Sequence, residues 1–150
     1  MWEDATTKYG FGQRRTYLLG KGLDSVMNYP FKNAVLDFVK GKPAEQAMTE
    51  ILTICEHYPA PAMDTALNFL STHDTERALT VIADEPANGR GRAWQSGRCV
   101  VGEAYEEGML RLRMAYAIIY TLPGVPCLYY GDEIAMQGYR DPFNWAFFRW

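Results

Sequence analysis

The sequence predicts an α/β fold built from parallel β-α-β units, because short apolar runs of strand length alternate with segments of helical periodicity. Three of the apolar runs end on a polar or aromatic corner: Asn28-Tyr29, His73-Asp74 and Asp132-Glu133. Right-handed crossovers bring the carboxyl ends of parallel strands to one edge of a sheet. We therefore expect these three corners to lie on the same side of the sheet.

Residues 1–22 have few apolar periods, and we expect a loop with one or two helical turns around Gln13 to Leu19. A short buried strand is predicted over 24–28. Pro30 then suits the first turn of a helix, where its missing N–H would be unpaired in any case. Four apolar residues at helical spacing form one stripe that ends at Gly41: Phe31, Ala34, Val35 and Phe38.

A second helix is predicted next, with its apolar face formed by Ala44, Ala47, Met48, Ile51, Leu52 and Cys55. Pro59-Ala60-Pro61 is expected to end it. A strand over 66–70, a polar cluster, a short helix to about Ala83 and a loop over 84–102 should follow.

The longest helix is predicted from Glu103 to Leu122, and its apolar residues cover more than one stripe, so we expect burial on most sides. A strand over 125–130 and a loop-like remainder complete the chain. If the units are parallel, the strands that hold Met27, Phe69 and Leu128 are sequential neighbours in one sheet.

Composition excludes several classes of function. A net charge of −3 gives no general attraction to phosphate, which argues against nucleic acid as a partner. No apolar run reaches the roughly 18 residues of a membrane span, and we expect neither a signal peptide nor an anchor. Three cysteines without C-x-x-C spacing favour neither a zinc site nor a disulfide framework, and they fit a reducing cytoplasm.

The polar cluster over 71–77 allows two interpretations. Its imidazole, carboxylates and guanidinium follow a buried strand, which is where α/β proteins place their chemistry. The same residues fit a helix start, with Asp74 or Thr75 as the cap of the helix toward Ala83. Both interpretations stay open on these residues alone.

Four blocks in order carry a resemblance to a known family: Trp2-Glu3-Asp4-Ala5, Tyr17 to Gly20 with Asp24 to Phe31, Asn68 to Arg77, and Gly124 to Ile134, extended by Gln137 to Asn144. They resemble the α-amylase family of glycoside hydrolases (family 13), nearest the neopullulanase, cyclomaltodextrinase and maltogenic amylase group. The resemblance covers nearly the whole chain. It implies a (β/α)8 TIM barrel that hydrolyses α-1,4 or α-1,6 glucosidic bonds with retention of configuration.

In that family the strand-seven motif ends in His-Asp, here His73-Asp74. The resemblance implies that Asp74 binds sugar hydroxyls and stabilises the oxocarbenium-like transition state, assisted by His73. The resemblance implies that Glu133 supports the site and is not itself a catalytic residue. We expect Arg77 to pair with a sugar or, preferably, with a carboxylate, and rings such as Tyr29 or Tyr139 to stack on a pyranose.

The resemblance places residues 1–150 after strand five through strand eight of the barrel, as one partial catalytic domain truncated at both ends. The acid/base Glu would precede Met1, and the nucleophile Asp lies on an earlier strand, so this fragment should be inactive alone. Near the C-terminus, Trp145 and Arg149 stand where an Arg and a Pro are expected.

The implied partner is an α-glucan such as starch, maltodextrin, pullulan or cyclodextrin, and a homodimer is compatible with the nearest group. No cofactor is expected. Calcium occurs in parts of the family, but no convincing ligand set is visible here. The alternative is a non-catalytic α/β module that either binds carbohydrate or only folds and associates with other protein chains. A doubly wound hydrolase or nucleotide binder is disfavoured, since G-x-S-x-G and a glycine-rich phosphate loop are missing.

Overall fold

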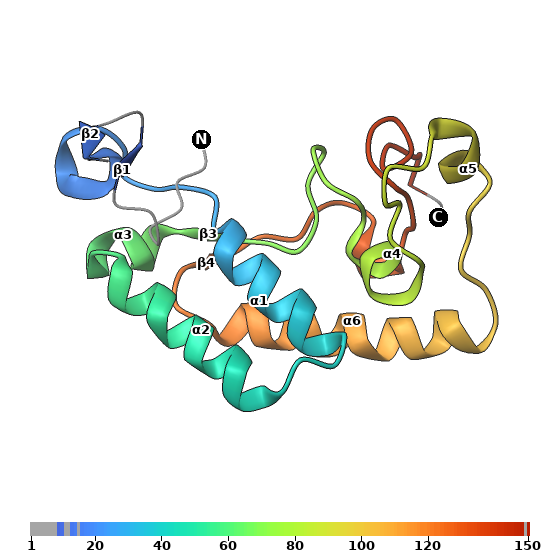
Figure 1. Cartoon of the computed structure of the whole chain (residues 1–150), viewed down its shortest axis with the longest axis horizontal. Helices are drawn as coiled ribbons and strands as arrows, with labels where there is room; N and C mark the ends of the chain where they lie inside the picture. Colours follow the sequence, from blue (N-terminus) through green and yellow to red (C-terminus); the bar gives the residue numbers. More distant parts are fainter. Residues whose placement is uncertain (1–8, 11–12, 15, 149) are drawn as a thin grey trace. The chain divides into compact units, whose positions relative to one another are not determined.

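The computed structural model describes residues 9–10, 13–14, 16–148 and 150. They form two compact units (Figure 1). The first unit comprises Met1–Phe69 and Ile118–Cys127, and the second comprises Leu70–Ala117 and Leu128–Trp150. The predicted family block Trp2-Glu3-Asp4-Ala5 lies outside the described residues.

The first unit begins with a small hairpin. Strand β1 (Tyr9–Gly10) pairs antiparallel with β2 (Gln13–Arg14), and a short π-helical turn, η1 (Tyr17–Lys21), follows. The helical turn predicted around Gln13 to Leu19 therefore lies a few residues further along the chain, and the residues at Gln13 are in a strand instead.

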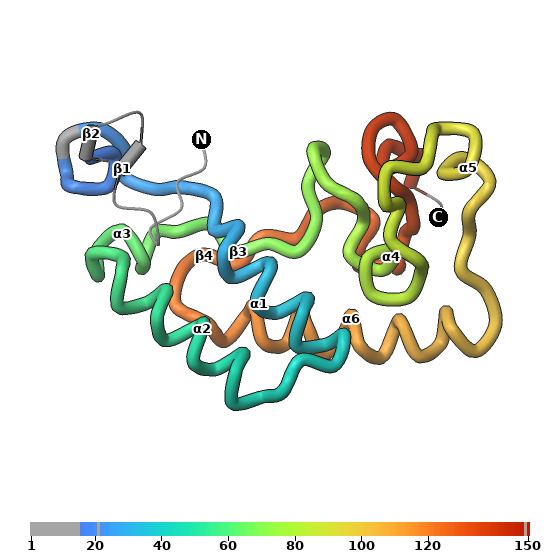
Figure 2. The backbone as a smooth tube through the Cα atoms, viewed as in Figure 1, coloured from blue at the N-terminus to red at the C-terminus, as the bar shows by residue number. Residues whose placement is uncertain are grey.

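The predicted parallel arrangement of the three strands is confirmed. Strand β3 (Leu67–Asn68) pairs in parallel with β4 (Val125–Pro126), and Met27 forms a parallel bridge to Leu67 on the other side. Figure 2 shows the segments of β3 and β4 running side by side. The order along the sheet follows the order along the chain, as a barrel arc requires.

All three strands are shorter than predicted. Regular pairing covers only Met27, Leu67–Asn68 and Val125–Pro126. Phe69 and Leu70 are nonetheless fully buried, which shows that their apolar character reflects packing and not ladder hydrogen bonds. Val125 is 47% exposed, so the apolar run over 125–130 is not a buried central strand here.

Helix α1 (Tyr29–Val39) begins as predicted, with Pro30 in its first turn and the Asn28 side chain accepting a hydrogen bond from the Phe31 N–H at 3.2 Å. Phe31, Ala34 and Val35 of the predicted stripe are buried. Asn28 is itself fully buried and donates to Asn68 Oδ1 at 3.0 Å, which fixes the start of the helix to β3.

Helix α2 (Ala44–His57) packs against α1 (Figure 1). Its buried face is narrower than predicted, because Met48 and Leu52 are more than half exposed while Ala47 and Ile54 are buried. A further helix, α3 (Ala60–Thr65), follows directly. The prolines at 59 and 61 were expected only to end a helix, but in its first turn they also permit a new one.

The core of the first unit gathers apolar side chains from these helices and the strand edge: Leu18, Val26, Phe31, Ile54, Tyr58, Ala62, Met63 and Ala66. Gly124 allows the chain to approach this core closely. Its φ is +113°, and a Cβ there would lie 2.6 Å from the Ala66 carbonyl oxygen. Only glycine satisfies both conditions without strain.

The second unit contains α4 (Ala78–Ala83), α5 (Arg92–Ser96), the greater part of α6 (Glu103–Thr121) and a short 3-10 turn, η2 (Asp132–Ile134). The bounds of α6 agree with the prediction within one residue. The short helix α5 lies where a loop was predicted. No helix among the described residues combines the length and apolar character that crossing a bilayer requires.

Helix α6 meets α4 through Gly108, where a Cβ would lie 2.7 Å from the Cβ of Ala83. Leu112 and Ala115 are buried on the same helix. Leu110 and Met114 are 63% and 43% exposed, so the expectation that α6 is buried on most sides is wrong. One helix face is covered in this chain, and the remaining apolar side chains face solvent.

Candidate functional site

The His73-Asp74 pair lies on a tight loop between β3 and α4. His73 Nε2 is 3.5 Å from Asp74 Oδ2, and the two side chains are 60% and 70% exposed. Within the loop, Thr75 Oγ1 accepts a hydrogen bond from the Thr72 N–H at 3.1 Å, and Thr72 Oγ1 accepts one from the Asp74 N–H at 3.2 Å. The threonines therefore shape the loop, and the imidazole and carboxylate project from it toward solvent.

The helix-cap interpretation of Asp74 and Thr75 is wrong. Helix α4 starts at Ala78, and the Ala78 N–H donates to Ser71 Oγ at 2.8 Å. Ser71 is seven residues earlier and almost fully buried. The free N–H group at the helix start is thus satisfied by Ser71, and the Asp74 carboxylate is not used for capping.

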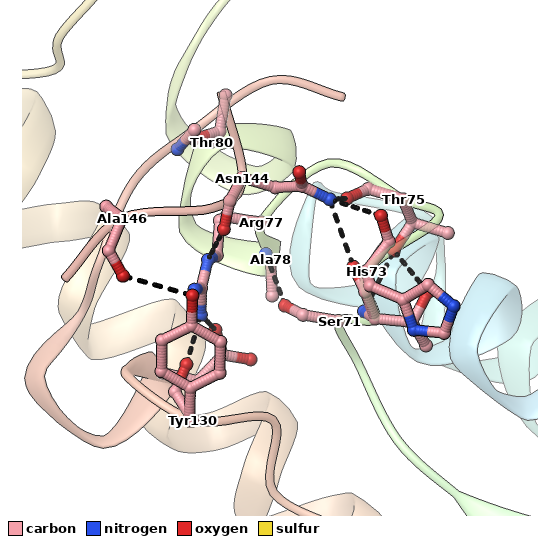
Figure 3. A network of polar contacts seen from close by, with 12 residues as sticks. Ser71, His73, Thr75, Arg77, Ala78, Thr80, Tyr130, Asn144 and Ala146 are labelled. Atoms are coloured by element: carbon pink, nitrogen blue, oxygen red, sulfur yellow. Dashed lines mark hydrogen bonds and ion pairs between the residues drawn. The ribbon is translucent and has the colours of Figure 1, made fainter. Parts of the chain in front are cut away.

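Asn144 holds the loop from behind. Its Nδ2 donates to three backbone carbonyl oxygens of the loop: His73 at 2.8 Å, Thr75 at 2.9 Å and Thr72 at 3.3 Å. Figure 3 shows the amide pointing at the His73 and Thr75 carbonyls. Asn144 is fully buried, so these hydrogen bonds are protected from water and restrict the loop strongly.

Arg77 is the central buried charge of the second unit, with a side chain that has no exposed surface. Its Nη1 lies 3.2 Å from Asp132 Oδ1 and also donates to the Tyr130 carbonyl, while its Nε donates to the Asn144 carbonyl at 3.1 Å. The guanidinium lies over the rings of Tyr129 and Tyr130, at 4.4 and 4.6 Å from their centroids. We call Arg77, Tyr130, Asp132 and Asn144 the Arg77 network.

The preferred expectation for Arg77, an ion pair with a carboxylate, is confirmed. The partner Asp132 comes from the polar corner after β4, and Arg77 follows the His73-Asp74 pair by three residues in the chain. Burial raises the pKa of Asp132, against the opposing effects of hydrogen bonds from Ser71 and Tyr116 and of the Arg77 charge. Because Arg77 is fully enclosed, its guanidinium supports the loop and offers no surface to a sugar.

Aromatic rings divide into buried and exposed ones. Tyr139 is 2% exposed, its hydroxyl donates to the Glu85 carbonyl, and its ring meets Trp94 edge-on at 5.3 Å. Burial, with Asp84 second, raises the pKa of Tyr139 to about 12. The expectation that Tyr139 stacks on a sugar is therefore wrong. Trp145, by contrast, is 58% exposed, and its ring centroid is 6.3 Å from that of His73.

Comparison with known proteins identifies the family. The α-amylase catalytic domain ("Alpha amylase, catalytic domain") matches residues 7–147. The chain belongs to the α-amylase catalytic domain family. The predicted resemblance is thereby confirmed.

Related α-amylase-family proteins are much longer than this chain. An amylopullulanase of Thermoanaerobacter thermohydrosulfuricus is 36% identical over 149 residues, which cover 89% of this chain and 9% of the relative. A cyclomaltodextrinase of a Bacillus species is 34% identical over 128 residues, which cover 84% of this chain and 19% of the relative. The chain thus corresponds to a tenth to a fifth of these relatives.

Solved structures give the same grouping. The ligand-free cyclic α-maltosyl-(1→6)-maltose hydrolase of Arthrobacter globiformis aligns with a TM-score of 0.64 and 29% identity, covering 85% of this chain and 24% of that one. The acarbose-soaked debranching enzyme of Nostoc punctiforme aligns with a TM-score of 0.66 and 25% identity, covering 90% and 28%. Together with the parallel strand order, family membership makes the fold part of a (β/α)8 barrel.

Within this α-amylase-family chain, the predicted site residues do not all fall in one unit. His73, Asp74 and Arg77 lie in the second unit. Tyr29 lies in the first, as the first residue of α1, and its ring meets that of Phe69 edge-on at 4.9 Å. Among the residues that the structure describes, no group of three or more His, Cys, Asp or Glu side chains is arranged to hold a metal ion.

Sequence reasoning missed two residues that shape the site, Ser71 and Asn144. Ser71 was considered only as part of a local capping pattern, whereas its real contact lies at the next helix. Asn144 appeared only at the end of a family block. Its partners lie 69 to 72 residues away in sequence, a distance that no local pattern reports.

Proposed function

We propose that the chain is part of the catalytic barrel of a retaining α-glucan hydrolase and supplies part of the substrate-binding surface. The observation that carries this proposal is the exposed His73-Asp74 pair, which follows β3 in the chain and is supported by the buried Arg77 network. Active-site residues of (β/α)8 enzymes lie at the carboxyl end of the strands. The names of the relatives, amylopullulanase and cyclomaltodextrinase, support an α-glucan as substrate.

In this proposal Asp74 accepts hydrogen bonds from the sugar hydroxyls next to the reacting carbon. Such contacts strengthen as the ring flattens toward the oxocarbenium-like transition state, and they therefore lower the barrier rather than only tighten binding. His73, 3.5 Å away, donates to a neighbouring hydroxyl and keeps the carboxylate oriented. Arg77 acts through the loop as a positioning residue, and Tyr29 remains a candidate for sugar contact.

We further propose that the segment corresponds to the barrel after strand five through strand eight. The nucleophile Asp and the acid/base Glu then lie on barrel strands outside residues 1–150. Retaining hydrolysis needs both carboxyl groups about 5 Å apart, so the 150-residue chain alone should not turn over substrate. Starch, maltodextrin, pullulan and cyclodextrin are all within the proposed substrate class.

Location and assembly complete the proposal. The cysteines Cys55, Cys99 and Cys127 are all free, which supports a reducing, cytoplasmic environment. A homodimer is part of the proposal because it is compatible with the group that the sequence resembles most. Sedimentation of the purified chain as a monomer at all concentrations would exclude that part.

The function is tested by calorimetric titration of the 150-residue chain with maltotriose, and with cellotriose as the β-linked comparison. We expect weak binding of maltotriose only, and a Kd raised about tenfold or more by Asp74→Ala, since hydrogen bonds to a charged group contribute roughly 1.5–3 kcal/mol. Asp64→Ala, which removes an exposed carboxylate from α3, is the matched control and should leave binding unchanged. Equal binding by wild type and Asp74→Ala would contradict the proposed site.

Turnover is measured in parallel on maltooligosaccharides, pullulan and cyclodextrin. The expected result is none. Hydrolysis that survives purification and disappears in Asp74→Ala would show that the catalytic carboxylates are within residues 1–150, which would overturn the segment assignment.

A further inference from the structure

Trp145 is a large apolar side chain exposed beside the proposed site. Its exposed fraction is 58%, close to the 60% and 70% of the neighbouring His73 and Asp74 side chains. Its ring and the imidazole of His73 are 6.3 Å apart between centroids, with their planes at 75°. An indole that stays exposed next to two polar side chains leaves an apolar surface uncovered, and a bound molecule can remove that surface from water.

The position of Trp145 is fixed by the same contacts that fix the His73 loop. Asn144, the preceding residue, donates to the carbonyls of His73 and Thr75, and its own carbonyl accepts from Arg77 Nε at 3.1 Å. The Trp145 N–H donates to the Pro142 carbonyl at 3.2 Å. Figure 3 shows Asn144 joined to both His73 and Arg77. The same hydrogen-bond network therefore fixes the backbone on which both the indole and the imidazole stand.

A glucose ring matches this pair of surfaces chemically. It has a flat face of C–H groups, which stacks on an aromatic ring, and an edge of hydroxyls, which needs hydrogen-bond partners. Because the imidazole stands at a steep angle to the indole, the two form a corner. A pyranose lying on the indole would present its hydroxyl edge to His73 and Asp74.

We propose that Trp145 is the stacking platform of a glucosyl subsite formed together with His73 and Asp74. This inference rests on the proposed function and adds a specificity residue to it. It concerns this chain in particular, since Trp145 stands where the family resemblance led us to expect an arginine. An arginine would offer hydrogen bonds at that place, whereas the indole offers an apolar face, so the subsite should select ligands by ring stacking.

The test follows the indole directly. In ¹H–¹⁵N spectra of the full 150-residue chain, the Trp145 Nε1–H signal is assigned by its loss in Trp145→Phe, and maltotriose is then titrated. We expect this signal to shift with the same Kd that calorimetry gives. Trp145→Ala should raise the Kd for maltotriose about fivefold to tenfold, and Trp145→Phe, which keeps an aromatic face, about twofold.

Phe147→Ala is the matched control, because Phe147 is a 96% exposed ring two residues further along the chain. It should leave the Kd unchanged, and an equal loss in Phe147→Ala would overturn the assignment to Trp145. If wild type binds maltotriose and responds to Asp74→Ala while Trp145→Ala binds normally, the platform is refuted and the proposed function stands. If wild type binds no maltotriose, the proposed function fails, and the platform fails with it.

Discussion

Replacing Arg77 by methionine tests whether the Arg77 network holds the second unit together. Methionine has a similar length and keeps much of the packing between Tyr129 and Tyr130, but it removes the charge and every hydrogen bond of the guanidinium. Asp132, whose side chain is 1% exposed, then remains as a buried carboxylate without its cation. Breaking a buried ion pair in this way costs about 3–5 kcal/mol.

Two backbone carbonyls also lose their donor, those of Tyr130 and Asn144. Since an unsatisfied buried acceptor costs roughly 1–3 kcal/mol, we expect a loss of about 4–6 kcal/mol for Arg77→Met, allowing for partial relaxation. For a domain of this size, that corresponds to a fall in Tm of roughly 10–20 °C. Circular dichroism melts and urea unfolding measure both quantities.

The double variant Arg77→Met/Asp132→Asn separates the lost pair from the stranded charge. Asparagine keeps an acceptor for the Tyr116 hydroxyl and carries no charge, so the double variant should recover about 2 kcal/mol relative to the sum of the single variants. A cost below about 1 kcal/mol for Arg77→Met, or strict additivity of the two substitutions, would refute the network as a stabilising unit.

The stability of the single variant Arg77→Met should depend on pH. The pKa of Asp132 is raised above its ordinary value of 3.8 in the folded protein, so the folded state keeps a proton that the unfolded state has lost. The contribution of Asp132 to stability is therefore largest below the unfolded pKa and falls as pH rises through the folded pKa. Removing Arg77 raises the pKa of Asp132 in the folded state further. The loss of unfolding free energy in Arg77→Met should therefore be larger at about pH 8 than at about pH 5. Equal deficits at both values would contradict the assignment of Asp132 as the stranded group.

Further substitutions test other contacts. Gly124→Ala should lower the free energy of unfolding in urea by about 2 kcal/mol or more, because Gly124 has a φ of +113° and lies close to the Ala66 carbonyl. The control Gly89→Ala, where φ is +78° but the space around the Cβ is open, should lower it by only about 1 kcal/mol. Equal losses in the two variants would contradict the close approach at Gly124. Asn144→Ala, which removes three hydrogen bonds to the His73 loop, should lower Tm and also weaken maltotriose binding, and unchanged binding would show that the loop keeps its shape unaided. Tyr139→Phe should cost about 1 kcal/mol and remove a phenol that titrates near pH 12 in ultraviolet absorbance; a full-amplitude titration near pH 10 in wild type would contradict the burial of Tyr139.

Much of the fold followed from local patterns in the sequence. The stripe from Phe31 to Phe38 predicted α1, the long apolar period predicted α6, and the alternation of runs predicted the parallel order through Met27, Leu67 and Val125. The lengths of the strands did not follow. An apolar run reports burial, and Phe69 and Leu70 achieve burial without a paired partner, so hydropathy alone cannot mark where the ladder ends.

The exposure of single side chains was the other failure. Tyr139 lies in a polar segment, yet it is 2% exposed: Trp94 packs on its ring, and the backbone carbonyl of Glu85, 54 residues earlier, accepts a hydrogen bond from its hydroxyl. Leu110 is one of many apolar residues on α6, yet it is 63% exposed. Whether a face is covered depends on which distant element packs there, and that information is not contained in the period of the segment itself.

The site shows the same division between local and distant information. His73 and Asp74 could be selected as candidates because a charged pair directly after a buried strand is a local signal, although the same residues also fitted a helix start. The residues that hold them could not, since Asn144, Tyr130 and Asp132 contact the loop or Arg77 from 53 to 72 residues away in sequence.

Exposed and enclosed residues of the site should respond differently to substitution. The side chains of His73 and Asp74 are mostly exposed and contribute little to the stability of the fold, so replacing them should change sugar binding and leave Tm almost unchanged. Arg77 and Asn144 are enclosed, so their loss should change both quantities together. Comparing binding and Tm across the four variants therefore distinguishes side chains that contact the ligand from side chains that only position them.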